Sequence, residues 1–264
     1  MTFERFRALH HGPEPLLLPN AWDHASAAAL AEAGFAAVAT TSLGVAAAAG
    51  LPDAEQATWA QTVTLARGIA TLGVPVTVDI EGGFGGPPAR VAERAAELAA
   101  AGVAGINIED GRGQGLAEVA EQVALIGAIK QQVPRLFVNA RTDPFWLRAP
   151  DALATAVHRV KAYADAGADG VFVPGAAGEP QVRALAAAAP VPLNVLIQPQ
   201  VPVARLAALG VARISYGSLL FRAALRAAVT TALQVAAGAP VPGDLPSYEQ
   251  VQRLRHRPGL PDPA

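Results

Sequence analysis

The chain has 264 residues, of which 52% are hydrophobic and 16% are charged, and its net charge is −2. That length suffices for one large domain or two small ones, and the weak net charge gives no electrostatic reason to expect nucleic acid or an anionic membrane as a partner. Cysteine is absent, which excludes disulfides, thiolate zinc sites and cysteine nucleophiles.

The start of the sequence does not resemble a signal peptide. The first residues, MTFERFRALHHG, are charged and lack the apolar centre of a signal peptide. We find no apolar segment long enough, and free enough of proline, glycine and charge, to span a bilayer. The sequence therefore predicts a cytoplasmic protein without a membrane partner.

Eight short apolar runs alternate with eight alanine-rich stretches along the chain. The predicted strands cover residues 16–19, 35–40, 74–80, 103–109, 135–141, 169–174, 192–197 and 212–216. The predicted helices cover residues 23–33, 54–71, 87–101, 115–132, 150–166, 178–188, 201–208 and 218–237. Several joints repeat one phrase, as in LAAAGVAGI and ADAGADGV, where a glycine caps a helix directly before a strand.

This alternation predicts an α/β fold of the (β/α)8 TIM barrel kind, which typically needs about 250 residues. An open doubly wound sheet alternates too, but it more often carries a GxGxxG turn after its first strand, where this sequence has LLLPNAWD. We expect residues 1–240 to form the barrel domain. Residues 241–264 form a proline-rich tail with one short helical piece, which either packs on a neighbouring subunit or is partly disordered.

Chemistry in such a barrel is located at the carboxyl ends of the strands. In VDIEGGFGG, residues 78–86, Asp79 and Glu81 share one face of a strand end. Glu109 and Arg141 end the next two strands. Polar residues at one strand end are expected wherever the chain surfaces, but here three successive apolar runs end in charged residues. Two carboxylates side by side repel each other unless a cation or a substrate lies between them.

Carboxylates without a well-placed histidine or cysteine favour Mg2+ or Mn2+ over Zn2+. Mg2+ keeps several waters and takes only one or two carboxylates directly, so the other acids would hold its water shell. The planar fork of Arg141 matches a carboxylate or phosphate. A metal and an arginine around an anionic substrate suggest that the site stabilises an enolate or oxyanion.

Six segments together resemble the isocitrate lyase/phosphoenolpyruvate mutase superfamily, in order and spacing, over about residues 16–225: PNAWDHASA, TTSLGVAAAAGLPD, VDIEGGFGG, INIED, NARTD and AYADAGADGVFVP. The resemblance implies a Mg2+-dependent (β/α)8 barrel of the phosphoenolpyruvate/pyruvate type. Its members make or break C–C or P–C bonds of small 2-oxo or 2-hydroxy carboxylates through a pyruvate enolate. It also implies a homo-oligomer, dimer or tetramer, that swaps the C-terminal helix between subunits.

The resemblance also assigns roles to single residues. Asp79 is similar to the direct metal ligand, Glu81 stands where the family more often has aspartate, and Asp53 and Glu109 resemble acids that bind the waters of the metal. The resemblance implies that substrate is bound by Thr41, Ser42, Leu43, Asp79, Arg141 and Asn194. Trp22 either packs at the rim or forms a wall beside the substrate. Arg141, Thr41 and Glu109 are the expected catalytic residues.

The lid that follows the fourth strand departs from the family pattern. Isocitrate and methylisocitrate lyases carry a lysine- and cysteine-containing lid there, and phosphoenolpyruvate mutase carries a lysine and an asparagine, whereas this chain has EDGRGQGLAEV. Gly111, Arg112 and Gly113 form the candidate lid, with a plain surface turn as the alternative. The lyases also carry a glutamate where this chain has Gly175.

Three functions remain open at this point. The first is a Mg2+-dependent C–C lyase that is similar to an oxaloacetate decarboxylase or a methylisocitrate lyase. The second is a phosphonomutase-type enzyme that acts on phosphoenolpyruvate or carboxyphosphonoenolpyruvate. The third is a non-catalytic relative that binds small acids. The substrate, the acid–base group and the oligomeric state are not determined by the sequence.

Overall fold

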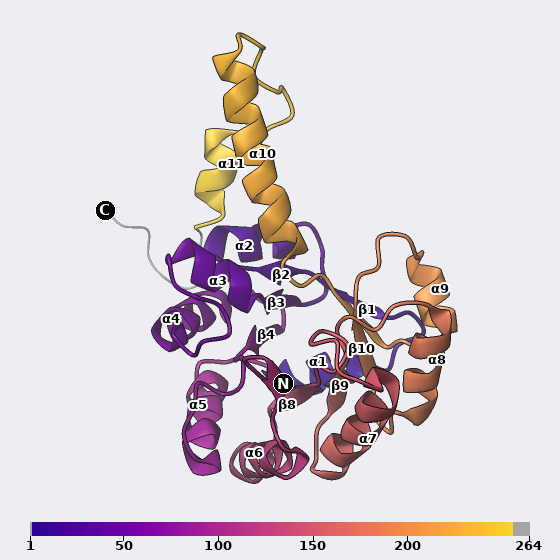
Figure 1. Cartoon of the computed structure of the whole chain (residues 1–264). Helices are drawn as coiled ribbons and strands as arrows, with labels where there is room; N and C mark the ends of the chain where they lie inside the picture. The colour runs from indigo at the N-terminus through magenta and orange to yellow at the C-terminus, as the bar shows by residue number, and fades with distance from the viewer. Residues whose placement is uncertain (1, 256–264) are drawn as a thin grey trace.

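The computed structural model describes residues 2–255, and its centre is a barrel of parallel strands (Figure 1). The strands follow one another around the barrel in the order β1-β11-β10-β9-β8-β5-β4-β3-β2. They are β1 (Leu16–Leu18), β2 (Asn20–Ala21), β3 (Val38–Thr40), β4 (Val76–Asp79), β5 (Gly105–Glu109), β8 (Phe137–Arg141), β9 (Gly170–Phe172), β10 (Leu193–Leu196) and β11 (Arg213–Ser215).

The break between β1 and β2 explains why nine strands make an eight-stranded barrel. Pro19 separates the two short strands; it has no N–H to donate, but its carbonyl accepts from Ala39 at 2.9 Å. β1 pairs with β11 and β2 pairs with β3, so the two halves of one strand close the ring. This closure excludes the open doubly wound sheet, and the predicted (β/α)8 barrel is confirmed.

Helices cover the outside of the barrel and bury apolar faces against it (Figure 1). They are α2 (His24–Glu32), α4 (Trp59–Ile69), α5 (Pro88–Ala100), α6 (Val119–Gln132), α7 (Ala152–Asp165), α8 (Glu179–Ala188) and α9 (Val203–Ala208). Outward-facing strand residues such as Val78 and Ile106 pack against helix residues such as Ile126. Inward-facing residues alternate with them, so their side chains reach the barrel interior.

A helix that the sequence analysis did not predict, α1 (Thr2–Leu9), closes the amino-terminal end of the barrel. Phe6 is fully buried, with its ring centroid 5.2 Å from that of Phe137. His10 follows the helix and stacks on Phe137 at 4.2 Å. The sequence shows only that this segment is charged and lacks the apolar centre of a signal peptide, whereas the structure shows that its aromatic face fills the amino-terminal end of the barrel.

Three further boundaries differ from the prediction. α3 (Ser42–Ala48) was not predicted, and the expected helix 54–71 begins only at Trp59. The expected helix 115–132 begins at Val119, because β6 (Gly111–Arg112) and β7 (Gly115–Leu116) form an antiparallel hairpin before it. Gly113 turns this hairpin with a φ of 58°, a left-handed conformation that glycine adopts readily.

The last long helix, α10 (Leu219–Ala236), projects from the barrel as an arm with α11 (Tyr248–Arg253) beside it (Figure 1). Phe221 is its buried residue. With 18 residues and a mean hydropathy of 1.3, α10 is long and apolar enough to cross a membrane, which corrects the expectation that no segment is. This finding rests on the length and composition of the helix alone. The predicted tail, 241–264, contains α11 and extends beyond the described residues.

Candidate active site

The turn after β4 begins the site at the carboxyl end of the barrel. Asp79 is the last residue of β4, and its N–H donates to the Thr40 hydroxyl at 2.9 Å. The N–H of Glu81 donates to Asp79 Oδ1 at 3.2 Å. Glu81 itself has a φ of 50°, a left-handed conformation that costs a non-glycine residue roughly 1 kcal/mol or more. The chain therefore holds these two acids close together against a backbone preference.

Glu81 is buried and held by the segment that precedes α4. Its carboxylate accepts from the Thr58 hydroxyl at 2.9 Å and from the Gln56 N–H at 3.0 Å. Burial raises the pKa of Glu81, the bonds from Gln56 and Thr58 oppose this, and the charge of Asp79 raises it further. Glu81 thus joins two loops in addition to adding negative charge.

Asp53 lies in the same segment and meets the same cluster of acids. Burial raises the pKa of Asp53, the Ser42 side chain lowers it, and the nearby Asp79 raises it again. Its Oδ1 is buried without a hydrogen-bond partner among the described residues. A buried carboxylate oxygen without a partner is costly, and a cation or its bound water would satisfy it.

Arg141 ends β8 and is oriented by two carboxylates. Its Nη1 lies 2.7 Å from Glu109 Oε2, and its Nε donates to Asp143 Oδ1 at 2.8 Å. Burial disfavours the charged guanidinium, but Glu109 and Asp143 outweigh it and raise the pKa of Arg141. Its Nη2 has no hydrogen bond to any described residue, so one edge of the fork is available to a ligand.

Glu109 and Asp143 also respond to the crowding of negative charge. Burial raises the pKa of Glu109; Arg141 opposes this, and Asp79 raises it further. Burial likewise raises the pKa of Asp143, with Arg141 opposing. Asp143 was not among the predicted site residues. The alternation of side chains around the strand end, in NARTD, could have placed it on the face of Arg141.

Asp110, next to Glu109, is a structural centre. It is fully buried and accepts from the Thr142 hydroxyl at 2.6 Å, Arg159 Nη1 at 2.9 Å and the Tyr163 hydroxyl at 2.6 Å. Its other oxygen accepts from the Asp143 N–H at 2.9 Å. Asp110 thereby fixes the segment after β8 and has its charge paired by Arg159.

The remaining acids outnumber their cations. Asp53, Asp79, Glu81, Glu109 and Asp143 influence one another electrostatically, and Arg141 pairs directly with two of them. Within residues 2–255, however, no three acidic or histidine side chains stand close enough to enclose a metal by themselves. An all-oxygen set with few direct ligands fits Mg2+, which retains waters, and does not fit Zn2+.

The other predicted substrate residues lie in two different places. Thr41 is the N-cap of α3, and Ser42 and Leu43 are its first residues, so their amides have no intrahelical partner. Trp22 packs edge-on against Phe221 at 5.4 Å. Asn194 is fully buried in the barrel, where its amide exchanges hydrogen bonds with the Ser215 hydroxyl, so the structure does not present it at the mouth as a free group.

The candidate lid forms the short hairpin β6–β7. Arg112 Nη1 donates to the carbonyls of Glu109 and Gly111 at 2.9 and 2.8 Å. A Cβ placed on Gly82 would lie 2.3 Å from the same nitrogen, so the arginine packs directly on the turn after β4. In this arrangement Arg112 braces the backbone of the site.

Comparison with known proteins gives the family. The model of the phosphoenolpyruvate phosphomutase family matches residues 6–236. An uncharacterised protein of Mycobacterium tuberculosis is 43% identical over 249 residues, covering 94% of this chain and 95% of its own. The 2-methylisocitrate lyase of Bacillus subtilis is 37% identical over 199 residues, covering 72% of this chain and 65% of its own.

Solved structures of similar fold agree with this family assignment. A candidate phosphonomutase from Burkholderia cenocepacia J2315 is 40% identical, with a TM-score of 0.83 over 88% of this chain and 98% of that chain. A phosphonopyruvate hydrolase in complex with oxalate and Mg2+ is 25% identical, with a TM-score of 0.85 over 97% and 95%. The chain belongs to the phosphoenolpyruvate phosphomutase family, within the phosphoenolpyruvate mutase/isocitrate lyase superfamily of lyases and mutases, as the sequence predicted.

Proposed function

We propose that the protein is a Mg2+-dependent lyase that cleaves a C–C bond of a small 2-oxo or 2-hydroxy carboxylic acid through a pyruvate enolate. The observation that carries the proposal is the excess of buried carboxylates around Asp79, beside an arginine with one free edge. Buried like charges need a cation, and the free edge needs an anion. The 2-methylisocitrate lyase relative supports cleavage of a C–C bond, and the complex of a phosphonopyruvate hydrolase with oxalate and Mg2+ supports a site for Mg2+ and a small carboxylate.

Each residue of the site would have a separate role. Asp79 would ligate the cation directly, while Asp53, Glu81 and Glu109 hold its waters. Mn2+ suits the same oxygen donors. Bound there, the cation supplies positive charge that stabilises negative charge developing on the 2-oxo oxygen. Arg141 binds the substrate carboxylate through Nη2, because Glu109 and Asp143 already hold its other two nitrogens. The Thr41 hydroxyl and the first amides of α3 would donate hydrogen bonds to the oxygen that becomes negative.

Decarboxylation of oxaloacetate fits these residues without a lid acid. The bond between C3 and C4 breaks, CO2 departs, and the electron pair of that bond forms the enolate. Water then gives a proton to C3, which yields pyruvate. Arg112 is tied to backbone carbonyls, and no lysine or cysteine lies in the hairpin, so solvent is the proton source that this chain offers.

The test is the midpoint of thermal unfolding with oxalate, with Mg2+, and with both. A ligand that binds only the folded state stabilises it, by about 2.7 kcal/mol when the free ligand is at a hundredfold excess over Kd, and so raises the midpoint. We expect a rise that needs both components, its loss in Asp79→Asn, and its retention in Asp165→Asn, an exposed acid at the end of α7. We expect pyruvate release from oxaloacetate to need Mg2+, to be lost in Asp79→Asn and to be retained in Asp165→Asn. No rise in the wild type would favour a binder without this chemistry.

A phosphonomutase is the second candidate, favoured by the family model and by the 40% identical Burkholderia structure. Phosphonate transfer needs additional cations around the phosphorus. At the mouth, Arg141 offers one free edge and Arg112 is bound to carbonyls. Phosphorus NMR of the protein with phosphoenolpyruvate would show a P–C product if this candidate is right.

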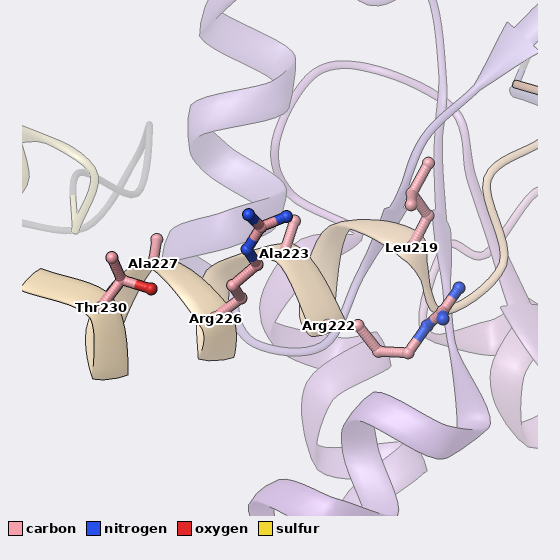
Figure 2. A pocket seen from close by; sticks show the side chains of 6 residues that line it. All are labelled: Leu219, Arg222, Ala223, Arg226, Ala227 and Thr230. Atoms are coloured by element: carbon pink, nitrogen blue, oxygen red, sulfur yellow. The ribbon is translucent and has the colours of Figure 1, made fainter.

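We also propose a homo-oligomer, dimer or tetramer, assembled through the arm. Leu225, Val229 and Leu233 are 52%, 60% and 66% exposed at four-residue spacing along α10, which places them on one face. A hollow of about 510 Å3 lies along the same helix and is lined by Leu219, Arg222, Ala223, Arg226, Ala227 and Thr230 (Figure 2). An exposed apolar stripe of this kind marks an interaction surface.

The cytoplasmic location of the protein stays a prediction.

Light scattering tests the assembly. Val229→Asp puts a charge in the middle of the stripe, and we expect the measured mass to fall to that of the monomer, 26.9 kDa. Gln234→Asp, at an exposed polar position off the stripe, should leave the mass unchanged. A wild-type mass of one chain would refute the oligomer, and exchange of α10 between subunits would need a structure of the assembly.

A further inference from the structure

The turn that follows Asp79 and Glu81 has an unusual backbone. Gly83, Phe84, Gly85 and Gly86 have φ values of 91°, 60°, 72° and 95°, so four consecutive residues are left-handed. Phe84 adopts this conformation although it has a side chain, which is nearly fully buried. The turn directs the carbonyls of Gly83, Phe84 and Gly85 toward one nitrogen atom, which belongs to Arg94.

Arg94 lies in the middle of α5 and reaches back to this turn. Its Nη1 donates to the carbonyl oxygens of Gly83, Phe84 and Gly85 at 2.8, 2.7 and 2.6 Å. One NH2 group has only two hydrogens, so the three carbonyl oxygens must share them. The oxygens surround this charged nitrogen in the way that they would surround a metal cation. The Nε of the same side chain is buried and has no hydrogen-bond partner within residues 2–255. The guanidinium is therefore placed by the carbonyls of the turn, at the expense of its own hydrogen bonding.

The same guanidinium also contacts the second loop of the site. Its Cζ lies 5.6 Å from the ring centroid of Trp59, and the Trp59 and Phe84 centroids are 5.3 Å apart. A guanidinium at this distance from an indole face is attracted to it. Trp59 begins α4, directly after the segment whose Gln56 and Thr58 bind Glu81. Arg94 thus contacts the turn after Glu81 and the first residue of the helix that follows the segment of Asp53.

We propose that Arg94 is a positioning residue for the acidic site: its positive charge holds the 82–86 turn against Trp59 and so fixes Asp79 and Glu81 relative to Asp53. The link to cation binding rests on the proposed function, whereas the effect on the turn does not. Two measurements separate these parts.

The first measurement is hydrogen exchange of the peptide that contains residues 80–87, with no metal added. Arg94→Ala removes the contact, Arg94→Lys retains a cation with three donors, and Arg90→Ala is the matched control one turn earlier, where an exposed arginine pairs with Glu93. We expect faster exchange in Arg94→Ala, an intermediate rate in Arg94→Lys and the wild-type rate in Arg90→Ala. Equal protection in all four proteins would overturn the proposal.

The second measurement is Mg2+ binding by calorimetry in the presence of oxalate, with circular dichroism to confirm folding. Loss of an outer residue that supports metal ligands typically weakens metal affinity by about 10–100-fold, and we expect that loss in Arg94→Ala. Arg94→Lys should lose less, and added methylguanidinium should restore part of the affinity in Arg94→Ala alone. Should Arg94→Ala fail to fold, Arg94→Lys against Arg90→Ala still decides the question.

The outcomes distinguish the two proposals. A wild type that binds neither Mg2+ nor oxalate refutes the proposed function and leaves the exchange result to decide the role of Arg94. A turn that loses protection in Arg94→Ala while Mg2+ binds with wild-type affinity refutes the positioning of the acids.

Discussion

Arg141 and Glu109 are register partners on neighbouring parallel strands, and their side chains form an ion pair in which Nη1 lies 2.7 Å from Oε2. The pairing of β5 with β8 places the two residues at the same level of the barrel mouth. Asp143 holds the Nε of the same guanidinium at 2.8 Å. The strand register thereby presents the remaining edge of Arg141 in a fixed direction.

Arg141→Lys should weaken the binding of a carboxylate substrate or of oxalate. Lysine carries a point charge without a planar fork, so it cannot serve Glu109, Asp143 and a ligand together. A hydrogen bond to a charged group is worth about 1.5–3 kcal/mol, which corresponds to roughly a 10–100-fold rise in Kd. Calorimetry measures this rise, and Arg135→Lys, at an exposed arginine, is the control. An unchanged Kd would contradict the assigned role.

Asp110→Asn should destabilise the whole domain. The carboxylate is fully buried and pairs with Arg159, Thr142 and Tyr163, so the substitution leaves a buried cation without its counter-charge. Removing one partner of a buried pair costs about 3–5 kcal/mol. Urea unfolding measures the free energy, with Asp165→Asn as the exposed control. A loss of activity at unchanged stability would instead indicate a direct role in the chemistry.

His10→Phe should change how stability depends on pH. Burial lowers the pKa of His10 from 6.5 to about 3, and the charge of Arg213 lowers it further. Below pH 6.5 the unfolded chain therefore binds a proton that the folded chain excludes, and the wild type loses about 1.4 kcal/mol per pH unit from this group as the pH falls toward 3. The group contributes no such loss above pH 6.5.

The comparison between variants isolates this effect. The unfolding free energy of His10→Phe, relative to the wild type, should rise as the pH is lowered from 7.5 to 5. The same difference, measured for His158→Phe, where the histidine is exposed on α7, serves as the reference. A difference for His10→Phe that does not change with pH would contradict the lowered pKa of His10.

Trp146→Phe should remove most of the fluorescence response to oxalate and Mg2+. The Trp146 ring is 59% exposed, and its centroid is 5.9 Å from the Arg141 guanidinium carbon, so a carboxylate arriving at Arg141 changes its surroundings. A fluorescence response that persists undiminished in Trp146→Phe would contradict the placement of the ligand at Arg141.

The position of Trp146 depends on Gly175, which the sequence showed only as a missing glutamate. Gly175 has a φ of 80°, and a Cβ there would lie 3.2 Å from the Trp146 backbone nitrogen. The segment after β8 therefore approaches the segment after β9 so closely that a side chain at position 175 would crowd the Trp146 backbone.

The sequence by itself determined the barrel, its family and the position of three charged residues at the strand ends. Hydrophobic periodicity and glycine caps are local signals, and strand ends in a barrel converge whatever the details of packing, so Asp79, Glu109 and Arg141 could be placed from order alone. The roles assigned to them as ligands and catalysts stay predictions.

Tertiary structure alone decided what each charged residue touches. Nothing local shows that Asp110 is neutralised by Arg159, that Asn194 is engaged by Ser215 inside the barrel, or that Arg94 meets three carbonyls. Three of the eight residues of α1 are charged, and one buried aromatic residue, Phe6, decided its place. These contacts join residues that lie far apart in the sequence, or they depend on a backbone conformation that packing imposes. Packing depends on the whole chain at once, so no local pattern predicts them.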